Sequence, residues 1–288
     1  MIVEQMLKNT QTPLLHIADV SGSALFQGDC LDIMPLIPDN SIDMILADLP
    51  YGTTACKWDT IIPFDKLWEQ YERIIKPNGA IVLTASQPFT SALVMSNPKM
   101  FKYEWIYEKT KASNFMLAKK QPMKYHENVC VFYKKQPTYN PQMTDAEVLD
   151  KRKSEGVYDC KDDGVLGSDV KAFRKLETGL RYPRSVQRFN NSDKTNIVHP
   201  TQKPVALFEY LIKTYTNEGE TVLDNTMGVG TTCLAAKELN RKFIGIEKEP
   251  KYYEIACQRC GFSITANVRG LCVRWGFPAL KPNSSNKL

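Results

Sequence analysis

The segment from Thr221 to Glu247 constrains the fold of this chain more than any other. It reads as a strand over 221–224, a turn with Gly228 and Gly230, a helix over 233–239 and a second strand over 243–247. Two glycines let the backbone turn tightly and approach a ligand that a Cβ atom would exclude. The helix that follows presents unpaired N–H groups at its N-terminus. The segment therefore predicts a nucleotide-type βαβ unit within a parallel sheet.

The spacing within this segment indicates which ligand the turn suits. Glu247 follows Asp224 by 23 residues, close to the offset of about 20 residues at which a carboxylate meets ribose hydroxyls. The full Gly-x-Gly-x-x-Gly pattern of dinucleotide sites is absent, because Cys233 occupies the third glycine position. An adenosyl ligand without a pyrophosphate is therefore favoured over NAD. The alternative is a structural βαβ unit whose glycines only turn the chain.

A second apolar run, Ile42 to Ala47, ends abruptly at the corner Asp48-Leu49-Pro50-Tyr51. A short, mostly apolar run that stops at a proline predicts a strand buried on both faces of a parallel sheet. Ligands of open α/β sheets bind at the carboxyl ends of such strands. A carboxylate, a carbonyl beside a proline and an aromatic ring can together hold a flat heterocycle that bears an amino group. The alternative is a strand followed by an ordinary turn.

The remaining periodic segments alternate between strand and helix patterns. Strands are expected over 24–29, 80–85, 103–107 and 128–133. A helical turn is expected over 31–37, and helices over 64–75, from Pro88, over 207–215 and from Pro250. Strands separated by helices of this length indicate βαβ units, because parallel neighbours need a long crossover. The chain is accordingly expected to be an α/β protein with a mostly parallel sheet.

Residues 134–198 differ from the rest of the chain, since periodicity fades and Lys, Arg, Asp, Gly and Tyr dominate. Basic residues interleaved with aromatic and hydroxyl side chains suit contacts to phosphates and bases. The net charge of +5 is compatible with a nucleic-acid partner. A solvated insertion of mixed charge is the alternative for this segment taken alone.

Composition excludes several classes of protein. No stretch approaches the roughly 20 apolar residues of a membrane span, and the first residues lack an apolar signal core, which argues against export and for a cytoplasmic protein. The eight cysteines are expected to be reduced. Cys257 and Cys260 have C-x-x-C spacing, but no second pair or spaced histidine completes a zinc site, so no metal is expected.

Three motifs together resemble a known family. They are Asp48-Leu49-Pro50-Tyr51, His199-Pro200-Thr201-Gln202-Lys203-Pro204 and Leu223 to Thr232. In this order they resemble the permuted β group of amino-group DNA methyltransferases, which methylate N6 of adenine or N4 of cytosine with S-adenosylmethionine. The resemblance spans about residues 24 to 260. It implies a Rossmann-like methyltransferase fold with a catalytic half (1–133), an inserted target-recognition region (134–198), a cofactor-binding half (199–260) and a partly disordered C-terminal extension (261–288).

The resemblance also implies roles for individual residues. Asp48 and the carbonyl of Leu49 would accept hydrogen bonds from the target amino group, and Tyr51, next to Pro50, would stack on the flipped base. The implied cofactor site for S-adenosylmethionine comprises Asp29, Thr201, Lys203, Asp224, Met227, Gly228, Gly230, Thr231, Thr232 and Glu247. Within it, Glu247 would hold the ribose and Asp29 would lie near the adenine ring. Candidate DNA contacts are Lys119, Lys120, Arg181, Arg184 and Arg188.

The chemistry of amino-group methylation agrees with these residues. An exocyclic amino group is a poor nucleophile, and two acceptors at its hydrogens favour a pyramidal nitrogen whose developing positive charge Asp48 stabilises. A C5-cytosine enzyme would need a nucleophilic Cys in a Pro-Cys pair, and no Pro-Cys occurs in the sequence. Leu49 stands where the family more often has Pro, which keeps the carbonyl but loosens φ.

Asp at the first position of the corner favours adenine, because Ser is commoner there in N4-cytosine enzymes. N4-cytosine methylation stays open, as do a catalytically inactive DNA-binding relative and a methyltransferase for RNA or protein amino groups. The expected partner is double-stranded DNA, which must release its target base by flipping. A homodimer and a cognate restriction endonuclease are further partners that the resemblance leaves open.

Overall fold

The computed structural model describes residues 2–9, 15–18, 22–53, 59–145, 156–160, 170–174, 180–191 and 202–262. The chain forms two compact units, one made of Met1–Asn140 with Ser185–Leu288 and the other of Pro141–Arg184. The motifs of the corner and of the glycine loop both belong to the first unit.

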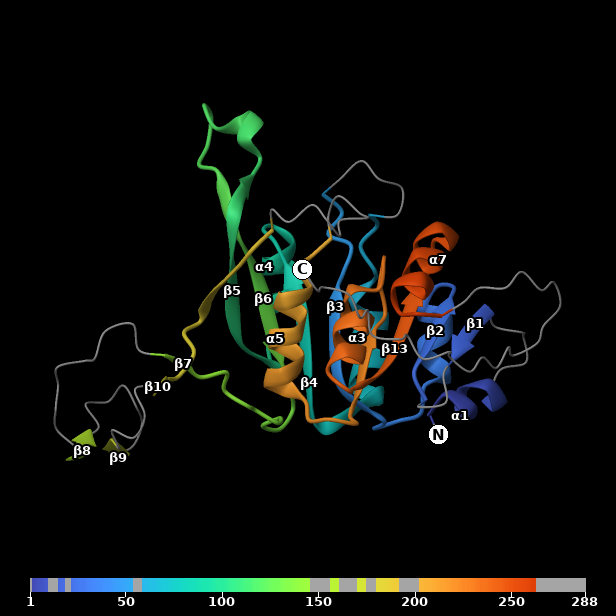
Figure 1. The fold of residues 1–288 in the computed structure, drawn as a ribbon, viewed down its shortest axis with the longest axis horizontal. Helices are drawn as coiled ribbons and strands as arrows, with labels where there is room; N and C mark the ends of the chain where they lie inside the picture. Colours follow the sequence, from blue (N-terminus) through green and yellow to red (C-terminus); the bar gives the residue numbers. More distant parts are fainter. Residues whose placement is uncertain are drawn as a thin grey trace, which may run out of the picture. The chain divides into compact units, whose positions relative to one another are not determined.

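The first unit is built on a nine-stranded sheet (Figure 1). Its strands in spatial order are β1 (Leu15–Ala18), β2 (Ala24–Gln27), β13 (Lys242–Glu247), β12 (Thr221–Asp224), β3 (Ile42–Asp48), β4 (Ile75–Ala85), β6 (Lys124–Phe132), β5 (Phe101–Ser113) and β11 (Val186–Phe189). The five strands from β2 to β4 are parallel, and antiparallel pairs occur only towards the two edges. The expected mostly parallel α/β sheet is confirmed.

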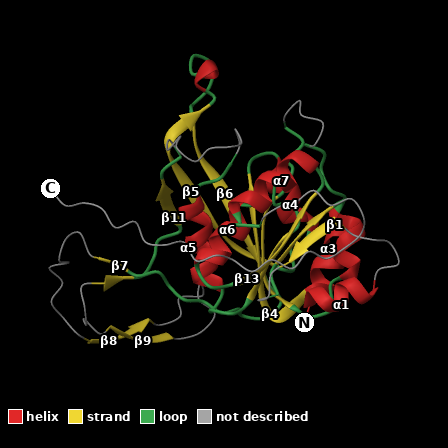
Figure 2. Ribbon diagram, turned by 45° about the vertical axis from the view of Figure 1, so that its right-hand side comes forward, coloured by secondary structure: helices red, strands yellow, loops and turns green. Residues whose placement is uncertain are grey.

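Helices cover both faces of this sheet (Figure 2). One face carries α1 (Ile2–Asn9), α2 (Cys30–Ile33), α3 (Phe64–Ile74) and α4 (Phe89–Ser96), and the other carries α5 (Val205–Tyr215), α6 (Thr231–Glu238) and α7 (Pro250–Arg259). Strand β3 is apolar from Met44 to Ala47 because these side chains enter both cores: Ile45 and Ala47 pack on the first face, and Met44 and Leu46 on the second. The chain's two halves thus supply one helical layer each.

Several elements differ in length from the sequence prediction. Helix α6 begins at Thr231 rather than at residue 233, and β4 begins at Ile75, directly after α3. Strands β5 and β6 are much longer than predicted and form a hairpin closed by the 3₁₀ turn Phe115–Leu117. Their outer parts lack the alternation of apolar residues that identified the inner parts, because no helical layer covers them. Helix α1 and strand β1 were not predicted.

The second unit contains two small antiparallel sheets. One pairs β7 (Thr144–Asp145) with β10 (Leu180–Arg181), and the other pairs β8 (Gly156–Cys160) with β9 (Val170–Arg174). This unit lies within the range 134–198 that was expected to be an insertion. Strand β11, from the same range, belongs to the first unit, where it pairs in parallel with β5. Most of the expected C-terminal extension lies outside the described residues.

Among the described residues, no helix has the length and apolar character needed to cross a membrane. The same part of the chain contains no group of three or more His, Cys, Asp or Glu side chains arranged to hold a metal ion.

Candidate active site and cofactor loop

Two neighbouring strands bring the corner and the glycine loop to one edge of the sheet. Strand β12 pairs in parallel with β3, so Asp224 and Asp48 both stand at carboxyl ends. The side chain of Thr226, in the glycine loop, donates a hydrogen bond to the backbone carbonyl of Asp48 at 3.2 Å. Motifs that are far apart in the sequence therefore form one continuous site.

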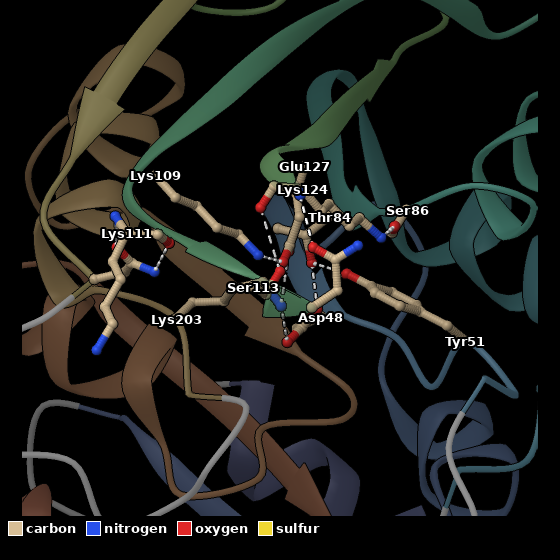
Figure 3. Close-up of polar contacts among 12 residues, drawn as sticks. Asp48, Tyr51, Thr84, Ser86, Lys109, Lys111, Ser113, Lys124, Glu127 and Lys203 are labelled. Carbon is tan, nitrogen blue, oxygen red and sulfur yellow. Dashed lines mark hydrogen bonds and ion pairs between the residues drawn. The ribbon is translucent and has the colours of Figure 1, made fainter. Parts of the chain in front are cut away.

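The carboxylate of Asp48 is held by three neighbours (Figure 3). Its Oδ1 accepts hydrogen bonds from the hydroxyls of Tyr51 at 2.7 Å and Thr84 at 2.5 Å. Its Oδ2 accepts from the ammonium of Lys203 at 2.7 Å. The side chain remains 27% exposed, and each carboxylate oxygen has two lone pairs. Asp48 is thus fixed in orientation and can still accept a hydrogen bond from a ligand.

A buried row of alternating charges continues from Asp48 into the long hairpin. Lys203 also lies 3.2 Å from Oε2 of Glu127 on β6, and the other oxygen of Glu127 pairs with Lys109 on β5 (Figure 3). Burial alone would lower the pKa of Lys203, but Asp48 and Glu127 raise it well above its usual value. Burial opposes ionisation of Glu127, and Lys203 and Lys109 outweigh it, so the pKa of Glu127 is lowered. Lys203 and Glu127 are therefore both charged at neutral pH.

The ring of Tyr51 is positioned as firmly as the carboxylate. It stacks on Phe89 with the ring centroids 5.1 Å apart and the planes inclined by 27°. Burial, followed by the charge of Asp48, raises the pKa of the Tyr51 phenol, so the phenol keeps its proton. The next residues turn away at Gly52, with φ of 66°, and the N–H groups of Gly52 and Thr53 both donate to Asp59. Leu49 is buried in the core at 4% exposed.

The two glycines of the loop have different surroundings. Both have positive φ, 52° at Gly228 and 75° at Gly230. A Cβ atom at Gly230 would lie 2.9 Å from the Cβ of Ala256 in α7, so this glycine allows close packing. A Cβ atom at Gly228 would meet nothing within 4 Å. The loop is therefore packed against the protein at Gly230 and opens onto free space at Gly228.

Carboxylates at the ends of β12 and β13 hold the loop in this shape. Glu247 accepts hydrogen bonds from the N–H groups of Gly228 at 2.8 Å and Glu249 at 2.7 Å, and burial raises its pKa. Asp224 accepts from the N–H of Thr226 at 3.0 Å and from the hydroxyl of Thr232 at 2.6 Å. Burial raises the pKa of Asp224 to about 7. Asp224 thus contacts the loop itself rather than solvent.

The donor and acceptor set at this edge fits an adenosyl ligand. Across β2, β13, β12 and β3, the carboxyl ends carry Asp29, Glu247, Asp224 and Asp48 in spatial order. Asp29 caps α2 by accepting from the N–H of Leu31 at 3.0 Å and pairs with Lys248 at 3.0 Å. Open space at Gly228 beside the Glu247 carboxylate suits a ribose, whose hydroxyls such carboxylates bind.

The structure places the other predicted site residues as follows. Met227 and Thr231 are buried in the loop and at the start of α6. Lys203, predicted among the cofactor residues, donates a hydrogen bond to Asp48. Lys119 and Lys120 are exposed near the tip of the β5–β6 hairpin, and Arg188 is exposed on β11. Arg181 and Arg184 belong to the second unit, and Thr201 lies outside the described residues.

Sequence reasoning missed Thr84, Glu127, Lys109 and Thr226 as partners of the site. The signal for Thr84 was available, because it lies one residue before the end of the strand expected over 80–85. The positions of Glu127 and Lys109 depend on the register of the hairpin, which the sequence does not give. The need for glycine at position 245 was also missed, because it depends on packing: a Cβ atom there would lie 2.3 Å from the sulfur of Met227.

A mostly parallel sheet with a glycine loop and a carboxylate corner at one edge defines a protein of the Rossmann-like methyltransferase fold. The model of the N6_N4_Mtase family, described as DNA methylase, matches residues 42–258. The chain belongs to this family.

Similar proteins agree with the family. The type II methyltransferase M.BglII of Bacillus subtilis is 27% identical over 263 residues, covering 81% of this chain and 68% of that protein. M2.MboI of Moraxella bovis is 26% identical, covering 84% and 89%. The crystal structure of an M1.HpyAVI–SAM complex has a TM-score of 0.58 at 24% identity and covers 83% of this chain and 98% of its own. PvuII DNA methyltransferase (cytosine-N4-specific) has a TM-score of 0.60 at 16% identity, with 86% and 88% covered.

Proposed function

We propose that this DNA methyltransferase transfers a methyl group from S-adenosylmethionine to the N6 amino group of adenine at a specific DNA sequence. The observation that carries the proposal is the Asp48 carboxylate, fixed by Thr84, Tyr51 and Lys203 directly beside the open face of the glycine loop. Direct transfer requires the target amino group to lie next to the methyl donor. The pairing of β3, which ends at Asp48, with β12, which leads into the glycine loop, supports this arrangement.

The chain's own residues position and polarise the target base. Asp48 and the carbonyl of Leu49 accept the two hydrogens of the amino group, so that the nitrogen lone pair is directed away from the ring. As the nitrogen gains positive charge, the ionised Asp48 stabilises it and accepts the proton that is released. Tyr51, held against Phe89, offers a ring on which the flipped base stacks.

The cofactor site follows from the same edge. S-adenosylmethionine supplies an electrophilic methyl group on a sulfonium. Glu247 binds the ribose hydroxyls, Gly228 leaves room for the cofactor and Asp29 lies towards the adenine end, while Asp224, Met227, Gly230, Thr231 and Thr232 shape the loop. Thr201 keeps its expected role near the cofactor. Lys203 keeps its expected place near the cofactor and also orients Asp48, since its ammonium contacts that carboxylate.

Double-stranded DNA is the proposed substrate, with Lys119, Lys120, Arg181, Arg184 and Arg188 as contacts. Residues 134–198 are the proposed target-recognition region. The relatives bear the names of type II methyltransferases, and on that ground the protein would protect DNA against a cognate restriction endonuclease. Whether one copy or a homodimer acts is decided by the mass of the protein–DNA complex.

Transfer of labelled methyl from S-adenosylmethionine to mixed-sequence DNA tests the proposed activity. Asp48→Ala should abolish transfer and leave cofactor affinity largely intact, because Asp48 contacts the base rather than the cofactor. Equal loss of both would mean that Asp48 has another role. Absence of transfer by the wild type would favour an inactive DNA-binding relative. Preferential labelling of RNA or protein would mean that the substrate is one of these rather than DNA.

The target base is decided by a separate measurement. Asp at position 48 favours adenine, whereas one structural neighbour is described as cytosine-N4-specific, so the N4-cytosine alternative has a concrete precedent for the fold. Modified DNA should be digested to nucleosides and separated by mass. N6-methyladenine is expected, and N4-methylcytosine alone would overturn the assignment.

A further inference from the structure

The β5–β6 hairpin presents exposed apolar side chains at its tip. Phe115 is 71% exposed and Met116 is 81% exposed, and both belong to the 3₁₀ turn that closes the hairpin. Leu117 and Met123 beside them are 42% and 43% exposed. The tip stands clear of the helices that flank the sheet (Figure 1). Clustered exposed apolar residues of this kind mark an interaction surface.

The tip is a structured element. Asn114, with φ of 62°, begins the turn, and its side chain accepts a hydrogen bond from the N–H of Lys124 at 2.7 Å across the hairpin. Turn bonds from the N–H groups of Ala118 to Phe115 and of Lys120 to Leu117 close the loop. Lys124 also bonds Ser86 at the end of β4. Phe115 and Met116 are thus carried on a braced support.

The charge around the tip indicates what the surface meets. Between Thr110 and Tyr125 the chain has no acidic residue and four lysines, namely Lys111, Lys119, Lys120 and Lys124. A second copy of this chain would bring lysines against lysines, whereas a nucleic-acid backbone complements them. The partner that suits an apolar tip with exposed lysines beside it is therefore DNA.

The register places the tip beyond the edge that carries the active site. The carboxyl end of β4 pairs at Ala85 with Asn128 of β6, and Thr84, one residue earlier, contacts Asp48. From Asn128 the hairpin continues outward to Lys124, about 13 Å at 3.3 Å per residue, before the turn is reached. The hairpin therefore extends past the same edge of the sheet at which the Asp48 corner stands.

We propose that Phe115 and Met116 enter the duplex beside the target base pair and fill the space that the flipped base leaves. The proposal rests on the function proposed above and adds the device that promotes flipping. Extrusion of a base costs a few kcal/mol of lost stacking and pairing, and apolar side chains inserted between base steps are an established way for proteins to replace lost stacking. The neighbouring lysines hold the adjoining phosphates.

The test compares duplexes in which flipping is costly or already accomplished. The methylated sequence is first read by sequencing DNA modified by the wild type. Two synthetic duplexes then carry this site, one fully paired and one with an abasic position opposite the target base. Single-turnover methyl transfer by Phe115→Ala/Met116→Ala should fall about ten-fold or more on the paired duplex and stay within about two-fold of wild type on the abasic duplex. Met95→Ala is the control, since Met95 is 72% exposed on α4, and it should transfer normally to both.

Equal loss on both duplexes, or no loss on either, would overturn the proposal. A variant that changes the oligomeric state in light scattering while the ratio between duplexes stays unchanged would assign the tip to a second copy instead. Transfer by the wild type tests the proposed methyltransferase function by itself. Failure of that function can therefore be told apart from failure of the proposed insertion, which only the variants test.

A binding measurement tests the insertion without relying on transfer. The Phe115→Trp variant adds one fluorescent ring, whose signal is the difference from wild type. When duplex DNA and S-adenosylhomocysteine are bound, this signal should fall, because the ring stacks between bases. Acrylamide should then quench it less than in the free protein. A tryptophan that stays accessible in the bound complex would contradict insertion.

Discussion

Lys203 joins the catalytic corner to the long hairpin, with its Nζ 2.7 Å from Oδ2 of Asp48 and 3.2 Å from Oε2 of Glu127. Its side chain is only 9% exposed, so water screens these two contacts little. One ammonium therefore lowers the pKa of Glu127 and fixes the orientation of the Asp48 carboxylate.

Replacing Lys203 by Met should reduce kcat strongly, by about a hundred-fold, with a smaller change in KM for S-adenosylmethionine. The reason is that Asp48 loses a fixed orientation and Glu127 is left beside it as a like charge. Breaking a buried ion pair also costs about 3 kcal/mol of stability, which denaturant unfolding measures. Lys203→Met should further shift the pH–rate profile to higher pH, because the pKa of Glu127 rises when its largest favourable partner is gone.

Lys76→Met is the matched control, because Lys76 forms an ion pair of similar length, 2.6 Å, with Asp43 elsewhere on β3 and β4, but is 38% exposed. It should leave kcat unchanged. If both variants lost activity equally, the effect would be one of general stability.

The two loop glycines should respond oppositely to alanine. Gly228→Ala adds a Cβ atom in open space, so the fold loses only about 1 kcal/mol for the positive φ, while the Kd for S-adenosylmethionine rises about ten-fold or more. Gly230→Ala forces contact with Ala256 and should lower the free energy of unfolding by about 2 kcal/mol or more.

Calorimetric titration of the cofactor and urea unfolding separate the two glycine effects. If Gly228→Ala bound S-adenosylmethionine as tightly as the wild type, the cofactor could not lie against Gly228.

Asp224 should make the protein less stable as pH rises. Its pKa is raised by burial from 3.8 to about 7, so the folded state binds the proton more tightly than the unfolded chain. Its favourable contribution is complete below about pH 4 and is lost as pH rises through about 7. Asp224→Asn keeps an acceptor for Thr232 without the charge. The free energy of unfolding is measured for both proteins from about pH 4 to about pH 8. The difference in favour of Asp224→Asn should grow as pH rises, and a difference that stays constant with pH would contradict a buried carboxylate with a raised pKa.

The hairpin lysines should contribute to DNA affinity through phosphates. Lys119→Ala/Lys120→Ala should weaken binding to any sequence and reduce the slope of log K against log salt by about 1.8, since each phosphate contact contributes about 0.9. The charge-matched control is Lys99→Ala/Lys102→Ala, two exposed lysines at the opposite end of β5. Fluorescence anisotropy at several salt concentrations provides the slopes, and equal slopes for both double variants would place the DNA elsewhere.

The centre of the sheet was predictable because local patterns decide it. The apolar run before Asp48 has to be buried on both faces of a sheet. The run before Asp224 is followed by two glycines, Gly228 and Gly230, whose spacing predicts a tight turn. The strands and the helices α3, α5 and α7 follow directly from such patterns. Strand β1 and helix α1 are only four and eight residues long, too short for their patterns to stand out, which explains why they were missed.

The polar network of the site was not predictable because it depends on register between distant strands. Lys203 precedes α5, Glu127 lies on β6 and Lys109 on β5, and no sequence spacing relates them. The outer hairpin likewise has no local signal, since Lys111 to Lys124 neither alternates in polarity nor faces a core. Three-dimensional pairing alone makes Lys203 a partner of Asp48.

The pairing of β3 with β12 also has a consequence for how the chain is made. Asp48 leaves the ribosome 173 residues before Thr221, an interval of about 10–35 s at bacterial and eukaryotic synthesis rates of about 5–20 residues per second. Throughout that time β3 has an open hydrogen-bonding edge in the middle of the future sheet, and such edges recruit foreign strands. The nascent first half is thus the stage at which this protein most needs a chaperone.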